Sequence, residues 1–93
     1  MSTIDGRFIA EIFRNQSVNV EIYGRLADEL QKHGPINPRQ ASKILCAASK
    51  AYAYENNQGA EAVPDLQFQA IYSLIFVSRD YALQAIKYYR RNH

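Results

Sequence analysis

The sequence predicts an all-α fold: a compact, irregular bundle of four or five helices with a long or bent C-terminal helix. Apolar residues recur at helical spacing along most of the chain, and only residues 75–77 hint at the alternation of a strand. Clusters of Gly, Pro and Asn divide the chain into segments of helical length. A chain of 93 residues is too short for two independent cores, so we expect a single domain over residues 1–93.

The first two helices are expected before residue 34. The first has a single apolar face made of Ile4, Phe8, Ile9, Ile12 and Phe13. A soft break at residues 15–17 precedes a second helix over about residues 18–33, which Gly34 ends.

The third helix is expected to run from Pro38 to about residue 56. Asn37 is suited to cap it, because its side chain can accept a hydrogen bond from a free backbone N–H, and proline is favoured at the first helical position. Residues 56–59 form the next break, and Pro64 restarts the chain.

The last segment, from residue 64 to 91, contains no Gly or Pro after Pro64. As one helix it would be about 42 Å long at 1.5 Å per residue, longer than a bundle of this size allows. It therefore protrudes or bends near residues 78–80, where Ser78 is suited to cap a new helix. Its main apolar stripe consists of Ile71, Leu74, Ile75, Ala82, Ala85, Ile86 and Tyr89.

A second apolar side of this segment carries Tyr72, Phe76 and Leu83, with basic residues nearby: Arg79, Lys87 and Arg90. A helix with two apolar sides is usually buried on both, so the simpler interpretation makes it the central helix of the bundle. The functional interpretation is an exposed surface that binds a partner. At the chain end, Tyr88, Arg90 and Arg91 are of the types enriched at protein–protein contacts, although cations there also complement the helix dipole.

The stretch from Arg25 to Leu45 resembles a helix-turn-helix: a Leu-Ala-x-x-Leu helix, a short connection and a Gln-Ala-x-x-Ile helix. The resemblance implies DNA binding by the helix from Pro38. Arg39, Lys43 and Lys50 would then meet phosphates, while Gln40 or Ser42 would reach base edges. The linker before Pro38 is longer than the usual three- or four-residue turn.

The sequence offers few of the residue patterns that catalysis or metal binding requires. The lone Cys46 lies mid-helix among small residues and is expected to be structural, and His33 and His93 are expected at the surface. No metal-ligand spacing and no glycine-rich loop occur, so we expect no enzyme activity and no cofactor. No apolar run approaches the roughly 20 residues of a membrane span, and a cytoplasmic location is the default expectation.

The resulting hypothesis is a small, non-enzymatic protein that binds a protein partner as an adaptor or inhibitor, of the size common among inhibitors encoded by phages or mobile elements. Homodimerisation is another way to bury the second apolar side. The alternative is a DNA-binding regulator that uses the helix from Pro38.

Overall fold

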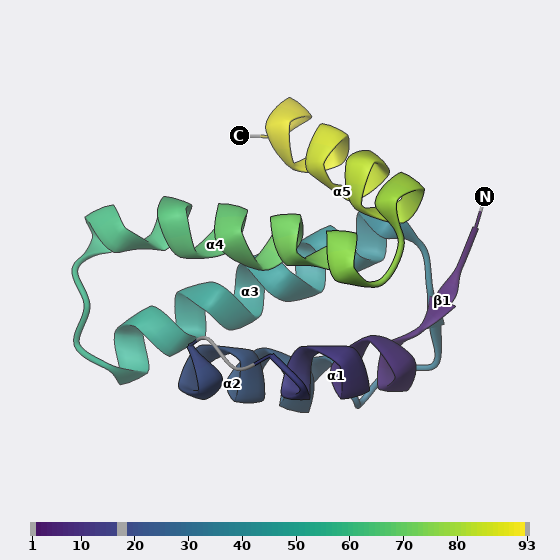
Figure 1. Cartoon of the computed structure of the whole chain (residues 1–93). Coiled ribbons are helices and arrows are strands. Elements are labelled where there is room, and N and C mark those ends of the chain that lie inside the picture. The colour runs from purple at the N-terminus through teal and green to yellow at the C-terminus, as the bar shows by residue number, and fades with distance from the viewer. Residues whose placement is uncertain (1, 17–18, 93) are drawn as a thin grey trace.

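The computed structural model describes residues 2–16 and 19–92, and within them it confirms the all-α bundle (Figure 1). Ser17, at the end of the predicted soft break, and His93 lie outside the described residues. The elements in chain order are β1 (Ile4–Asp5), α1 (Gly6–Arg14), α2 (Val20–Leu30), β2 (Pro35–Ile36), α3 (Pro38–Glu55), the 3-10 helix η1 (Ala60–Ala62), α4 (Val63–Tyr72), the 3-10 helix η2 (Ser73–Phe76) and α5 (Arg79–Arg91).

Helix α3 is the centre of the bundle. It packs against α2 on one side and against α4 and α5 on the other. Figure 1 shows it crossing between the α1–α2 pair and the α4–α5 pair. The simpler interpretation of the C-terminal segment as the central helix is therefore wrong. Small buried residues suit α3 to this position, because Ala41, Ser42, Ala48 and Ser49 let neighbouring helices approach closely.

The predicted start of α3 is confirmed in detail. The Asn37 side chain accepts a hydrogen bond from the backbone N–H of Gln40 at 2.8 Å, and the Gln40 side chain accepts one from the Asn37 N–H at 2.8 Å. This reciprocal capping box satisfies backbone donors that would otherwise have no partner, and Pro38 stands at the first helical position.

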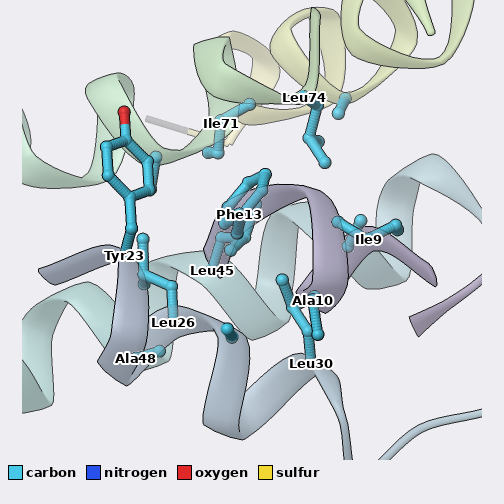
Figure 2. Close-up of a cluster of buried hydrophobic side chains, with 14 of the residues drawn as sticks. Ile9, Ala10, Phe13, Tyr23, Leu26, Leu30, Leu45, Ala48, Ile71 and Leu74 are labelled. Atoms are coloured by element: carbon cyan, nitrogen blue, oxygen red, sulfur yellow. The ribbon is translucent and has the colours of Figure 1, made fainter. Parts of the chain in front are cut away.

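The hydrophobic core lies where α1 and α2 meet α3 and the α4–η2 segment (Figure 2). The rings of Phe13 and Tyr23 meet edge to face, with centroids 5.5 Å apart. The Tyr23 hydroxyl forms a 2.5 Å hydrogen bond with the hydroxyl of Ser73, so the only polar atom of this ring is satisfied inside the core.

The C-terminal segment is bent, as one of the two predicted alternatives requires. Helix α4 ends at Tyr72, η2 continues to Phe76, and Ser78 caps α5 by accepting a hydrogen bond from the Tyr81 N–H at 3.3 Å. The longest dimension of the molecule is 36 Å, less than the about 42 Å of an unbroken helix. The bend turns α5 back onto α3 and α4.

The first helix is shorter than predicted. Its N-cap is Asp5, which accepts a hydrogen bond from the Arg7 N–H at 2.8 Å, so the chain before Gly6 is extended. Ile4 therefore belongs to β1, where it pairs with Ile36 in a short antiparallel ladder. Phe8, predicted on the apolar face, is 53% exposed.

Candidate functional site

Exposed apolar side chains concentrate near the C-terminal bend. Among the residues described, five of the eight large exposed hydrophobic side chains fall between positions 68 and 83. These five form what we call the α4–α5 aromatic face: Phe68, Tyr72, Ile75, Phe76 and Leu83. Tyr72, Phe76 and Leu83 were predicted from the sequence as a contact surface, and they are 50%, 59% and 52% exposed.

Two of the rings of this face contact each other. Phe68 and Tyr72 stack with centroids 6.0 Å apart and planes 25° apart. Phe68 also lies 6.4 Å from the ring of Tyr89, a contact that links α4 to α5. The face is thus held on packed helices rather than on loops.

Sequence reasoning missed two members of the face. Phe68 precedes Tyr72 by four positions, and Tyr72 precedes Phe76 by four, so the helical spacing already pointed to Phe68. Ile75 was assigned to the core stripe, but η2 is a 3-10 helix with about three residues per turn, so a wheel drawn at 100° per residue misplaces it.

The basic residues of α5 divide between two sides of the helix. Arg79, Leu83 and Arg90 share one line by helical spacing, so Arg79 and Arg90 flank Leu83 of the aromatic face. The residues Gln84, Tyr88 and Arg91 share another line, and with Lys87 they border a depression of about 390 Å³ whose other wall is Pro38 and Arg39 of α3.

Arg39 and Tyr88 make the best-defined polar contact between α3 and α5. The Nε of Arg39 donates a hydrogen bond to the Tyr88 hydroxyl at 2.9 Å, and its guanidinium carbon lies 5.1 Å from the centre of the Tyr88 ring. These two residues belonged to separate predicted sites, one for DNA and one for a protein partner. The fold brings them together.

A second depression, of about 380 Å³, continues along α3 beyond Tyr88. Its uncharged lining residues are Ser42, Cys46, Ala47, Gln67, Tyr88, Tyr89 and Asn92. Lys43 and Lys50, both exposed, stand at its α3 wall. Because Tyr88 lines both depressions, they form one surface between α3 and α5, which we call the α3–α5 groove.

The two residues predicted to read DNA bases, Gln40 and Ser42, differ in their surroundings. Ser42 is buried against the neighbouring helices, which corrects its expected place at a base edge. The Gln40 side-chain oxygen is engaged in the capping box of α3. Arg39, Lys43 and Lys50 do lie exposed on α3, as predicted for phosphate contacts.

Basic residues are paired with carboxylates in the first part of the chain. The pairs are Arg7–Asp5 at 2.7 Å, Arg14–Asp28 at 3.0 Å, Arg25–Glu29 at 3.0 Å, Arg25–Glu55 at 3.3 Å and Lys32–Glu29 at 3.1 Å. Within residues 2–16 and 19–92, no ion pair reaches any basic residue from Arg39 onward. Among the described residues, the basic side chains of α3 and α5 therefore have no ion-pair partner.

Burial raises the pKa of the Cys46 thiol, which lowers the fraction of reactive thiolate at neutral pH. In the part of the chain that the structure describes, no group of three or more His, Cys, Asp and Glu side chains is arranged to hold a metal ion. In the same part, no helix is both long enough and apolar enough to cross a membrane.

Comparison with known protein families, with characterised proteins and with solved structures finds no match to this chain.

Proposed function

We propose that the chain is a non-enzymatic binding protein that docks a protein partner, as an adaptor or inhibitor, on the α4–α5 aromatic face. The observation that carries the proposal is the exposed cluster of Phe68, Tyr72, Ile75, Phe76 and Leu83 on packed helices. Exposed apolar patches mark interaction sites more often than ordinary surface.

The composition and rigidity of the face support this proposal. Aromatic residues dominate binding energy at interfaces because they bury a large area with few rotatable bonds. The stacking of Phe68 on Tyr72 orders these rings before a partner arrives, which lowers the entropy cost of binding.

The flanking charges indicate the chemistry of the partner. Arg79 and Arg90 stand beside Leu83, and no described carboxylate pairs with either. The matching surface of a partner is an apolar patch with acidic residues at its rim, because opposite charges at a rim favour encounter and register.

The test is affinity capture from the native host with three forms of the protein: wild type, Phe76→Asp and Phe8→Asp. Phe8 is a matched control, since it is a phenylalanine on α1 whose side chain is similarly exposed. We expect a protein that co-purifies with wild type and with the Phe8 variant but not with the Phe76 variant. With the purified partner, Phe76→Ala should weaken binding by about 30-fold or more, the cost of losing a central aromatic anchor.

Both aspartate variants should keep their helical circular dichroism, because each replaces a side chain that is more than half exposed. Loss of the captured protein in both variants would contradict a specific role for this face. A purified wild-type dimer that Phe76→Asp converts to a monomer would assign the face to self-association instead.

A further inference from the structure

We infer that the α3–α5 groove binds single-stranded nucleic acid. This function is separate from docking of a protein on the aromatic face, and it depends on different residues. The groove carries five cationic side chains on two helices: Arg39, Lys43 and Lys50 on α3, and Lys87 and Arg91 on α5.

Electrostatics make the groove a site for a polyanion. In the part of the chain that the structure describes, no carboxylate lines either of its two depressions, and none of its five cations has an acidic partner. Elsewhere, the basic residues from Arg7 to Lys32 are all paired with carboxylates. The net charge of +2 therefore conceals a local concentration of positive charge.

The dimensions and the lining of the groove fit a single strand of nucleic acid. Arg39 and Lys50 are eleven residues apart on α3, about 16 Å along the helix, which spans several consecutive phosphates. Between them the lining combines apolar and aromatic side chains, Cys46, Ala47 and Tyr88, with the uncharged polar side chains of Gln67 and Asn92. The Tyr88 ring and the apolar side chains can accept bases by stacking and apolar contact, whereas an acidic peptide would present carboxylates to them.

Arg39 is held ready to bind a phosphate. Its Nε is engaged by the Tyr88 hydroxyl and its guanidinium lies over the Tyr88 ring, so the side chain is oriented while the terminal nitrogens remain able to donate to an oxyanion.

The same geometry disfavours duplex DNA. A helix with its side chains is about 10–12 Å wide, and the major groove of B-DNA is about 12 Å wide. Helix α5 packs along the cationic side of α3, so α3 is too broad with its neighbour to enter that groove. The basic stripe of Arg39, Lys43 and Lys50 thus forms one wall of the α3–α5 groove.

The experiment is a fluorescence anisotropy titration of a labelled 20-nucleotide oligothymidylate with the full chain at 50 mM NaCl. We expect saturable binding that weakens with salt, with a slope of about −3 in log K against log [salt], from four or five phosphate contacts at about −0.7 each. Lys43→Glu and Lys50→Glu should each weaken binding about tenfold or more. Arg14→Glu, which makes the same charge change on α1, should stay within about twofold of wild type.

Two competitors test the choice of ligand: an unlabelled duplex of the same length and poly-glutamate. Weak competition by both supports the proposal. The proposal is overturned if wild type shows no saturable binding, or if Arg14→Glu loses as much affinity as Lys43→Glu. It is also overturned if either competitor displaces the labelled oligothymidylate as effectively as unlabelled oligothymidylate does. Circular dichroism melts of each variant establish that it is folded, as expected for exposed lysines.

Discussion

Gly6 stands where the start of α1 meets the end of α2. Its backbone N–H donates a hydrogen bond to the Gly34 carbonyl at 2.8 Å. A Cβ at this position would collide with the backbone carbonyl oxygen of Leu30 and would come within 2.8 Å of the carbonyl oxygen of His33. Backbone atoms cannot swing away as a flexible side chain can, so the close approach of the two helices requires glycine here.

We therefore expect Gly6→Ala to lower the free energy of unfolding by about 2–3 kcal/mol, and Tm by about 10–20 °C. Gly24→Ala is the matched control. Gly24 lies within α2, and a Cβ added there would meet no atom within 4 Å, so alanine should raise stability by about 0.5–1 kcal/mol. Thermal melts of both variants check the prediction, and equal effects of the two substitutions would contradict it.

Tyr81 links α5 to the chain before α3. Its ring is buried, and its hydroxyl donates a hydrogen bond to the Ile36 carbonyl at 2.8 Å. Burial raises the pKa of Tyr81 to about 12, because the phenolate would lose its hydration in the core. The neutral phenol is therefore favoured in the folded state, and its contribution to stability is complete below about pH 10, the pKa of an unfolded tyrosine.

This contribution should be lost as the pH rises from about 10 toward 12 and beyond. At pH 11.5 we expect the wild-type free energy of unfolding to have fallen by about 2 kcal/mol more, relative to pH 9, than that of Tyr81→Phe. Urea denaturation at the two pH values gives the comparison. The other tyrosines are present in both proteins, so their effect on the pH dependence cancels in the comparison. The same fall in the free energy of unfolding for wild type and Tyr81→Phe would refute the role of Tyr81.

Among the elements, the break before α5 depends on Ser78. This residue is extended, with φ −162° and ψ 126°, and its side chain accepts a hydrogen bond from the Tyr81 N–H. Ser78→Ala should destabilise the protein by about 1 kcal/mol, because it removes the cap of a helix that packs on both α3 and α4.

Ser78→Asp provides the control, since aspartate is an equally good N-cap and its charge suits the helix N-terminus. Urea denaturation should place this variant within about 0.5 kcal/mol of wild type. If alanine and aspartate at position 78 have the same effect, the cap contributes little and packing alone fixes the bend.

Element boundaries could be predicted where local chemistry sets them. The start of α3 depends on Asn37, Pro38 and Gln40, and the start of α5 depends on Ser78. In each case the residues lie within one turn of the start of their own helix. The start of α1 could not be predicted as well, because β1 forms by pairing Ile4 with a residue 32 positions away. Such tertiary pairing is invisible to helical periodicity, which instead extended the helix through Ile4.

At the scale of the molecule, the candidate site could be predicted in part. Helical spacing identified Tyr72, Phe76 and Leu83 as a surface distinct from the core stripe, and they are exposed. The α3–α5 groove was not visible in the sequence, since Arg39 and Tyr88 are 49 residues apart and meet only because α5 folds back. Composition also concealed the charge pattern, because the two halves of the chain carry similar net charge and two of the five ion pairs, Arg14–Asp28 and Arg25–Glu55, form only when different helices pack together.

Helix α5 separates the two proposed surfaces, and this separation makes them testable together. Its Arg79–Leu83–Arg90 line belongs to the aromatic face, and its Gln84–Tyr88–Arg91 line borders the α3–α5 groove. We expect Phe76→Asp to lose the protein partner while its affinity for oligothymidylate stays within about twofold of wild type. The double variant Lys43→Glu/Lys50→Glu should show the reverse, because no change in either variant touches the other surface.

The measurements are affinity capture of the partner and fluorescence anisotropy of labelled oligothymidylate, both on the same protein preparations. Thermal melts establish that both variants remain folded. Substitutions at sites without shared partners act independently, so each variant should fail in one assay only. If Phe76→Asp lowers the affinity for oligothymidylate as much as the double lysine variant does, the two surfaces form a single site, and α5 does not divide them.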